Sequence, residues 1–259
     1  MTRFASWNVN SLKVRQERVE QWLADIAPDV LCMQETKIAD SAFPQLMLEA
    51  MGYAAAHHGE GRWNGVAILS RRGLDDVSFG FADGAEPDAE ARIMTARCDG
   101  ITVVTVYVPN GRALDADHYV YKLAWLDRLA AHVRAVSTPG DPVIVAGDFN
   151  IAPTDADVYD PAAFEGATHV SEPERSRLQG LLDGGLVDVF RHHHPDATGV
   201  YSWWDYRRGD FHQGRGMRID LVLASAPVVE RSRWCVIDRN ARKGTAPSDH
   251  APVVVDLAD

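Results

Sequence analysis

Apolar residues recur along the chain with two spacings, the alternation that is typical of strands and the wider period of helices. Residues 3–9 predict a buried strand, and Ser11 can cap a helix that runs to about Ala27, because apolar side chains follow the helical period there. Pro28 ends this helix, and residues 30–33 form a short apolar strand. The chain therefore begins with a strand, a helix and a second strand.

The same two patterns continue to the carboxyl end. Helices are predicted at residues 43–51, 115–136 and 173–183, the second of them from an apolar stripe along one face. Further strands are predicted at residues 53–57, 66–70, 92–97, 101–108, 142–146, 186–190, 219–223, 228–237 and 253–257.

The order of these elements indicates an α/β fold of the α+β type. Strands outnumber helices and only a few helices lie between strands, which favours two mixed sheets packed face to face over a doubly wound parallel sheet. No low-complexity linker or fixed-period repeat divides the chain. Residues 1–259 are therefore expected to form one domain.

Composition is that of an ordinary globular protein, with 46% hydrophobic and 24% charged residues. No apolar segment is long enough to span a membrane, and the strand-like start argues against a signal peptide. Cys32, Cys98 and Cys235 are not spaced as a zinc site or a disulfide framework. Reduced thiols and a cytoplasmic location are the simplest expectation.

The net charge of −11 at first argues against a polyanionic partner. The charge is unevenly distributed, because residues 74–90 contain six acids and no base, whereas residues 231–243 contain five bases and one acid. A basic face on the carboxyl-terminal half is therefore compatible with a nucleic-acid partner, although a solvated basic surface explains the same composition.

Polar residues gather at or near the ends of the predicted strands. Asp148 and Asn150 follow the strand at 142–146 with one residue between them, which puts both side chains on one face of an extended chain. Carboxylate beside carboxamide suits binding a cation or orienting a water molecule, but it also suits a turn in which both satisfy backbone groups. Five further groups of this kind lie at Asn8, Glu35, Tyr107 with Asn110, Asp220, and Asp249 with His250. Six groups beside apolar runs favour a shared functional site.

Six blocks in this order resemble the signature of the exonuclease III family. They are WNVN at residues 7–10, QETK at 34–37, YVPNG at 107–111, GDFN at 147–150, RID at 218–220 and SDHAP at 248–252. The block YSWWDYR at 201–207 narrows the resemblance to the DNA-repair branch of the endonuclease/exonuclease/phosphatase superfamily. It implies a four-layered sandwich like that of DNase I, and a Mg-dependent nuclease that cleaves on the 5′ side of abasic sites, leaving a 3′-OH, or removes nucleotides from 3′ ends.

The resemblance also implies roles for the strand-end residues. Mg²⁺, with Mn²⁺ as a substitute, prefers oxygen ligands, and Glu35 is the leading one. Further ligands, direct or through water, are expected at Asn8, Asp148, Asn150 and Asp249. By analogy, Asp148 orients or deprotonates the attacking water and is held by Asn150. His250, positioned by Asp220, contacts the scissile phosphate. Tyr107 and Asn110 donate hydrogen bonds to that phosphate.

The implied partner is duplex DNA with abasic sites or 3′ ends, without a membrane or an obligate protein partner. One of two neighbouring tryptophans is expected in the core, and Trp204 is assigned to a pocket for a flipped-out abasic sugar. Met217 or Ile219 would add further walls to this pocket. Phosphate contacts are predicted for Arg207 and Arg215, although both also suit a solvated loop. Lys37 is expected to position the acidic cluster or a phosphate, or to be a surface lysine.

Two other functions compete with a DNA nuclease. The first is a phosphatase or phosphodiesterase acting on a non-DNA phosphoester, against which the block at 201–207 argues. The second is a non-catalytic DNA-binding member, against which the complete carboxylate–histidine set argues. The three histidines at 192–194 lack a metal-ligand partner and are expected in an exposed loop. His169 and residues 209–216 are candidates for setting the balance between endonuclease and exonuclease activity, and the sequence does not decide that balance.

Overall fold

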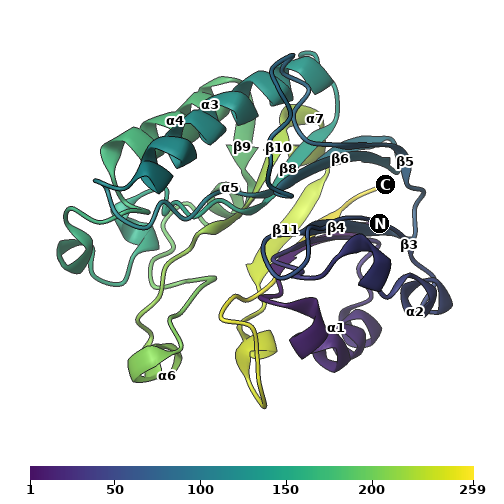
Figure 1. Ribbon diagram of the computed structural model, residues 1–259, viewed down its shortest axis with the longest axis horizontal. Coiled ribbons are helices and arrows are strands. Elements are labelled where there is room, and N and C mark those ends of the chain that lie inside the picture. Colours follow the sequence, from purple (N-terminus) through teal and green to yellow (C-terminus); the bar gives the residue numbers. More distant parts are fainter.

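Each of two sheets is built around one pair of parallel strands joined by a helix. The pairs are β1 (Thr2–Asn8) and β2 (Val30–Gln34) with α1 (Leu12–Ile26), and β7 (Ile101–Tyr107) and β8 (Val143–Asp148) with α3 (Asp117–Val136). Parallel neighbours need such a crossover because the chain must return to the edge where the first strand began. The computed structural model describes all residues from 1 to 259 and places the two sheets face to face (Figure 1).

Antiparallel strands extend both sheets to six strands. The first sheet has the order β11–β12–β1–β2–β4–β3 and the second β5–β6–β7–β8–β10–β9. The bounds of the added strands are β3 (Ala54–His58), β4 (Val66–Ser70), β5 (Asp75–Phe79), β6 (Ile93–Cys98), β9 (Leu186–Asp188), β10 (Asp220–Ser225), β11 (Ser232–Ile237) and β12 (Val253–Leu257). The predicted pair of mixed sheets is confirmed.

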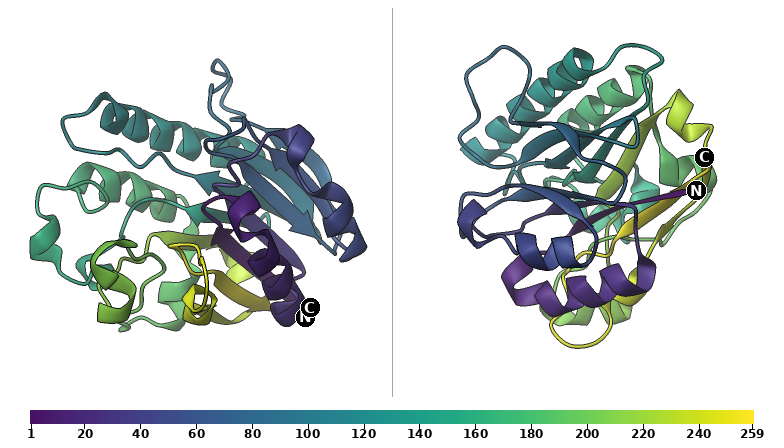
Figure 2. Two further views of the ribbon diagram at one scale, coloured as in Figure 1. Left: turned by 60° about the horizontal axis from the view of Figure 1, so that its bottom comes forward. Right: turned by 90° about the vertical axis from the view of Figure 1, so that its right-hand side faces the viewer.

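Helices cover the outer face of each sheet and complete four layers (Figure 1, Figure 2). α1 and α2 (Gln45–Ala50) lie against the first sheet, and α3 and α4 (Glu172–Asp183) against the second. The core between the sheets takes buried residues from both, among them Phe4 and Ile144. Because a fully buried side chain of this kind stabilises the fold by roughly 1.5–3 kcal/mol, this shared core fixes the strand ends of one sheet relative to those of the other.

Two predicted strands are partly helical. The apolar run at 186–190 divides into β9 and α5 (Val189–His193), because the Asp188 side chain accepts a hydrogen bond from Arg191 N and caps the helix. The strand predicted at 228–237 begins only at Ser232, because Pro227 opens a short helix, α7 (Ala226–Val229). A third short helix, α6 (Asp210–Gln213), lies in the arm formed by residues 205–216.

Two other local expectations were wrong. Ser11 precedes α1 but has a φ of 84° and makes no side-chain capping hydrogen bond. The histidines at 192–194 end α5 instead of forming an exposed loop. His193 Nε2 is 2.8 Å from Ser232 Oγ, and His194 Nε2 donates to the backbone oxygen of Cys235 at 2.7 Å.

The remaining features of the fold agree with the composition. All three cysteines are buried free thiols. None of the helices combines the length and the apolar character that crossing a membrane requires. The sequence does not predict β5, because all five of its residues are exposed at the sheet edge and it lacks an apolar face.

Candidate active site

The ends of three neighbouring strands of the second sheet set Tyr107, Asp148 and Asp220 in a row. Asp148 is the register partner of Tyr107 across the β7–β8 pair and of Asp220 across the β8–β10 pair. Register partners project to the same face of a sheet, so these three side chains share one side. Gly147 permits the close approach of β8 to β7, because a Cβ at this position would meet the Val106 oxygen at 1.9 Å.

The parallel strands of the first sheet end opposite this row, at Asn8 and Glu35. Asn8 is fully buried, and its Nδ2 donates to Glu35 Oε1 at 2.8 Å and to Asp148 Oδ2 at 2.9 Å. Glu35 directly follows β2 with a φ of 51°, which ends the extended course of the strand. One amide therefore joins two carboxylates that different sheets supply.

Asp148 is a buried carboxylate among other charges. Its Oδ1 accepts a hydrogen bond from Asn150 N at 2.9 Å. Burial raises the pKa of Asp148, and the negative charges of Asp220 and Glu35 add to the rise, whereas His250 opposes it. A carboxylate with a raised pKa is a stronger proton acceptor than an exposed one.

His250 lies between Asp220 and Asp148. Its Nδ1 donates to Asp220 Oδ2 at 2.8 Å, and its Nε2 is 3.8 Å from Asp148 Oδ2. Burial by itself lowers the pKa of His250, but the charges of Asp220 and Asp148 outweigh burial and raise it. The ring is therefore an imidazolium whose Nε2–H faces Asp148.

Glu35, Asp148 and His250 are the one group of acidic and imidazole side chains whose ligand atoms all lie within 4.8 Å of one another. Two carboxylates from different sheets offer the hard oxygen donors that suit Mg²⁺. Their mutual repulsion contributes to the raised pKa of Asp148, and a divalent cation between them would relieve it. The donor set therefore fits a hard divalent cation with Glu35 and Asp148 as ligands, because a protonated His250 has no free lone pair to offer.

Two other predicted metal ligands have their oxygens occupied. Asn8 Oδ1 accepts a hydrogen bond from Asn10 N at 3.0 Å. Asp249 accepts one from Asn10 Nδ2 at 2.8 Å and one from Trp203 Nε1 at 3.1 Å. Asn8 therefore holds the carboxylate pair, whereas Asp249 lines the cavity and holds Asn10 and Trp203 beside it.

Lys37 contacts the acidic cluster directly. Its Nζ is 2.6 Å from Glu35 Oε2 and donates to Asn10 Oδ1 at the same distance. The side chain is 26% exposed, so water screens this ion pair only partly. Lys37 thus holds Glu35 from the side opposite to Asn8.

Asn150, Asn110 and His169 meet beside Asp148. His169 Nε2 lies 3.0 Å from Asn150 Oδ1 and 3.1 Å from Asn110 Nδ2. Asn150 Nδ2 donates to the backbone oxygen of Val108 at 2.9 Å. Burial lowers the pKa of His169 and the Lys122 ammonium lowers it further, so the imidazole ring is neutral.

Tyr107 is held by a cation that stacks on its ring. The Arg92 guanidinium carbon is 4.5 Å from the ring centroid, and Arg92 Nη1 donates to the Tyr107 backbone oxygen at 3.2 Å. Burial raises the pKa of the Tyr107 hydroxyl well above its ordinary value, and the nearby Glu35 carboxylate raises it further. The hydroxyl therefore keeps its proton and can donate it in a hydrogen bond.

Many of these side chains, among them Glu35, Asp148 and His250, line a cavity of about 400 Å³, which is within the usual size range of small-ligand sites. The carboxylates, His250 and Tyr107 form its polar wall. Apolar walls come from Phe164, Met217 and Ile219, so both residues that were predicted as walls line the cavity. One side of the cavity thus suits a charged phosphate and the other a sugar.

Trp203 lines this cavity, and Trp204 does not. Trp204 is 1% exposed and packs edge to face against Phe211. The two rings face opposite sides as expected, but the assignment of Trp204 to the pocket was wrong. The reason lies in the backbone, because Trp203 forms isolated bridges with Met217 and His250 that turn its side chain towards the site.

Of the two predicted phosphate contacts, Arg207 lines the cavity. Its side chain is 85% exposed and pairs with Asp205, with Nη2 2.5 Å from Asp205 Oδ2. Arg215 pairs with Asp210 within the arm 205–216 and is not a lining residue. The phosphate contact predicted for Arg215 stays a prediction, and it would lie outside this cavity.

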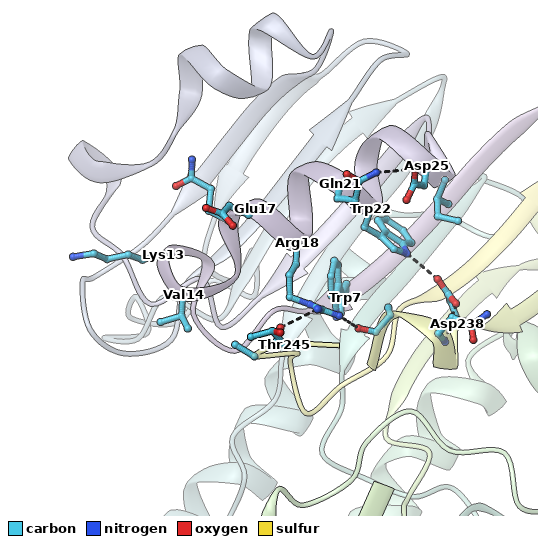
Figure 3. A pocket seen from close by; sticks show the side chains of 15 residues that line it. Trp7, Lys13, Val14, Glu17, Arg18, Gln21, Trp22, Asp25, Asp238 and Thr245 are labelled. Carbon is cyan, nitrogen blue, oxygen red and sulfur yellow. Dashed lines mark hydrogen bonds between the residues drawn. The ribbon is translucent and has the colours of Figure 1, made fainter. Parts of the chain in front are cut away.

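A second and larger hollow, about 1100 Å³, lies between α1 and residues 238–246 (Figure 3). Several of its polar groups are paired with one another. Trp22 Nε1 donates to Asp238 Oδ2 at 2.9 Å, and Arg18 Nη1 donates to the Thr245 backbone oxygen at 2.9 Å. It contains no set of converging metal-ligand atoms, so size alone does not identify the functional site.

Comparison with known proteins gives consistent matches over the whole chain. The model of the Endonuclease/Exonuclease/phosphatase family matches residues 5–250. Exodeoxyribonuclease III of Haemophilus influenzae is 34% identical over 263 residues, which cover 97% of this chain and 98% of that protein.

Solved structures agree with these matches. A 3′ phosphatase, NExo, from Neisseria, bound to product DNA hairpin, is 39% identical with a TM-score of 0.97 over 100% of both chains. An AP endonuclease from Archaeoglobus fulgidus is 38% identical with a TM-score of 0.95 over 99% of both chains.

Proposed function

The chain belongs to the endonuclease/exonuclease/phosphatase family, and on that basis we propose that it is a metal-dependent DNA-repair nuclease. It hydrolyses phosphodiesters on the 5′ side of abasic sites, leaving a 3′-OH, and removes nucleotides from the 3′ ends of duplex DNA. Support comes from relatives described as an exodeoxyribonuclease III and an AP endonuclease, each more than 30% identical over nearly the whole chain. The observation that carries the proposal is the approach of Glu35 and Asp148, from different sheets, to the His250–Asp220 pair.

Asp148 is the proposed proton acceptor for the attacking water. Asn150 N fixes Oδ1 of this buried carboxylate, so Asp148 can orient the water and accept its proton. The water oxygen bonds to phosphorus, the bond from phosphorus to the 3′-oxygen breaks, and the water proton passes to Asp148. The departing 3′-oxygen takes up a proton from solvent water. The products are a 3′-OH and a 5′-phosphate.

His250 and Tyr107 stabilise the charge that develops on the phosphate. The imidazolium offers its Nε2–H because Asp220 holds the other ring nitrogen. Tyr107 offers a hydroxyl that stays protonated, and Asn110 adds an amide N–H from the same end of β7. Fixed donors aimed at the developing charge lower the barrier more than mobile water does.

The metal site is assigned to Glu35 and Asp148, with Asn8, Asn150 and Asp249 as supports that act through hydrogen bonds or water. Mg²⁺, or Mn²⁺ in its place, would neutralise charge on the phosphate oxygens and on the leaving 3′-oxygen. Lys37 and Asn8 keep Glu35 in place from two sides.

The apolar half of the cavity is proposed to hold the deoxyribose. Trp203, Met217 and Phe164 surround a space that a sugar without a base can enter, and turning out such a nucleotide costs little because it neither stacks nor pairs. Arg207 at the rim is proposed to contact a backbone phosphate by exchanging its Asp205 partner.

A second candidate activity is removal of a phosphate from a 3′ end, because a relative that is 39% identical is described as a 3′ phosphatase. This reaction needs the same donors and the same water-orienting carboxylate. In both reactions the bond from phosphorus to the 3′-oxygen of the remaining chain breaks, and the product released here is inorganic phosphate instead of a 5′-nucleotide.

Comparing substrates tests the proposal. The protein would be incubated with Mg²⁺ and, separately, duplexes carrying one abasic site, a plain 3′ end or a 3′-phosphate, and with inositol phosphates. We expect cleavage of the DNA substrates and none of the inositol phosphates. Turnover of inositol phosphates alone would place the protein among the non-DNA phosphoesterases, and binding to DNA without any cleavage would indicate a non-catalytic member.

A further inference from the structure

An ion pair between Lys122 of α3 and Glu174 of α4 is completely buried. Both side chains have an exposed fraction of 0%. A buried ion pair is a weak device for stability, because removing two charges from water costs about as much as their attraction returns. A pair of apolar residues of the same size would fill this space, so the charges call for another explanation.

The Lys122 ammonium binds the backbone of both loops that carry amide side chains into the cavity. Its Nζ donates to Asn150 O at 2.7 Å and to Asn110 O at 3.3 Å, besides Glu174. These carbonyls follow the ends of β8 and β7, where the sheet no longer supplies donors. Thr168 Oγ1 also lies 3.4 Å from Nζ, so the three hydrogens of the ammonium are shared among four oxygens.

The Glu174 carboxylate binds the third loop of the site. Its Oε1 accepts a hydrogen bond from His169 N at 3.0 Å and lies 2.7 Å from Thr168 Oγ1. Thr168 Oγ1 is also 3.0 Å from Asn110 O. A single ion pair therefore holds the backbone at Asn110, Asn150 and His169, which are the residues whose side chains meet beside Asp148.

Gly111 lets the loop after β7 rest directly on this pair. Its φ is 89°, and a Cβ there would lie 2.9 Å from Thr168 Oγ1 and 3.1 Å from Lys122 Cδ. The backbone of Asn150 also has a positive φ, 51°, in the left-handed region that asparagine enters more readily than most residues. The loops are thus shaped to reach the ion pair.

We propose that Lys122 and Glu174 are positioning residues for the nuclease reaction, and that they set Asn110, Asn150 and His169 relative to Asp148 and the phosphate. The inference rests on the proposed function. The two residues touch neither water nor substrate, so their effect passes through the three loops. The pair acts on the rate of the chemical step, and DNA binding through the outer surface stays largely unchanged.

Four variants separate positioning from stability: Lys122→Met, Glu174→Met, the double variant of both, and Glu174→Gln. Lys122→Met leaves the Glu174 charge buried and alone, so it should lower both Tm and kcat. The double variant removes both charges, so its Tm should lie above that of Lys122→Met, but below that of the wild type because Ser171 N and His169 N lose their acceptor. Its kcat should stay about 10- to 100-fold low with KM for DNA nearly unchanged, because Asn110 O and Asn150 O still lack a donor.

Glu174→Gln is the conservative variant, because the amide oxygen of glutamine can still accept a hydrogen bond from His169 N. It should retain more kcat than Glu174→Met. His132→Gln is the matched control, because His132 is equally buried but bonds to Ala82 N and Thr95 Oγ1, away from the cavity. This control should lower Tm and leave kcat unchanged.

The side-chain amide resonances of Asn110 and Asn150 in ¹⁵N-labelled protein provide a readout that does not depend on activity. They should shift in Lys122→Met and in the double variant, and stay in place in His132→Gln. A double variant with the Tm and the kcat of the wild type would overturn the inference. So would a fall of kcat in His132→Gln that matches its fall in Tm, because kcat would then follow stability alone. If the wild-type protein cleaves no DNA, the proposed function fails, and unshifted amide resonances would then overturn the positioning role independently.

Discussion

Asp220 accepts a hydrogen bond from His250 Nδ1 at 2.8 Å, although 30 positions separate the two residues in the sequence. This contact turns the other ring nitrogen of His250 towards Asp148 and the cavity. It also supplies the negative charge that keeps the ring protonated. The catalytic proposal therefore depends on Asp220 even though Asp220 itself need not touch DNA.

Replacing Asp220 by Asn should lower the incision rate by about 100- to 10,000-fold. An asparagine keeps the shape of the contact but neither stabilises the imidazolium nor fixes the protonated nitrogen. Single-turnover incision of an abasic duplex measures the effect, with the Kd for DNA as a control for binding. A rate within about threefold of the wild type would show that the charge of Asp220 is dispensable.

Replacing Asp148 by Asn should preserve DNA binding and abolish incision. The change removes the proposed proton acceptor and one of the two carboxylates of the metal site while it conserves volume. Fluorescence anisotropy with a labelled duplex measures binding, and gel separation of the products measures incision. Asp183→Asn, at the exposed end of α4, is the control for loss of one charge. Near-normal turnover in Asp148→Asn would falsify the assignment.

Replacing His169 by Ala should raise abasic-site incision relative to 3′-end removal. The ring of His169 lines the cavity between Asn110 and Asn150, so a smaller side chain leaves more room for a displaced deoxyribose. The ratio of the two rates, measured on one duplex that carries both substrates, is the appropriate quantity. An unchanged ratio would indicate that the balance is set elsewhere, with residues 209–216 as the next candidate.

Stability should depend on pH through His132, which is fully buried. Burial lowers the pKa of His132 from 6.5 to about 4, so the native ring stays neutral while the unfolded chain takes up a proton. The contribution to stability is complete above pH 6.5 and is lost as the pH falls towards 4. The expected loss between pH 7 and pH 5 is roughly 2 kcal/mol. Urea unfolding at both pH values should show a smaller loss in His132→Gln, and equal losses in the two proteins would contradict this origin.

Much of the fold could be predicted from local patterns. The predicted strands at 66–70 and 253–257 agree with β4 and β12 at both ends, because buried strands read as short apolar runs. The prediction of one strand at 186–190 was partly wrong, because an apolar run alone does not distinguish a strand from a helix. The cap at Asp188 begins a helix within this run. β5 carries no pattern at all, since it is exposed on both faces.

Only those site residues that lie at strand ends could be predicted from the sequence. Glu35, Asp148 and His250 do come together, as the six blocks indicated. The side of the sheet that Trp203 faces depends on bridges to residues far along the chain, which local alternation cannot reveal. Lys122 and Glu174 lie on two different helices 52 positions apart, and no short-range pattern marks a charge that will be buried.

We propose above that Glu35 and Asp148 hold a divalent cation for the cleavage of DNA. The most direct test uses a labelled duplex with a single abasic site, incubated with Mg²⁺, with EDTA, and with Mg²⁺ restored in excess after EDTA. The account predicts a nick on the 5′ side of the abasic site with a 3′-OH in the first and third reactions and none in the second, and little incision by Glu35→Gln at the same Mg²⁺ concentration. Incision that persists in EDTA, or a Glu35→Gln variant that nicks at the wild-type rate, would contradict it.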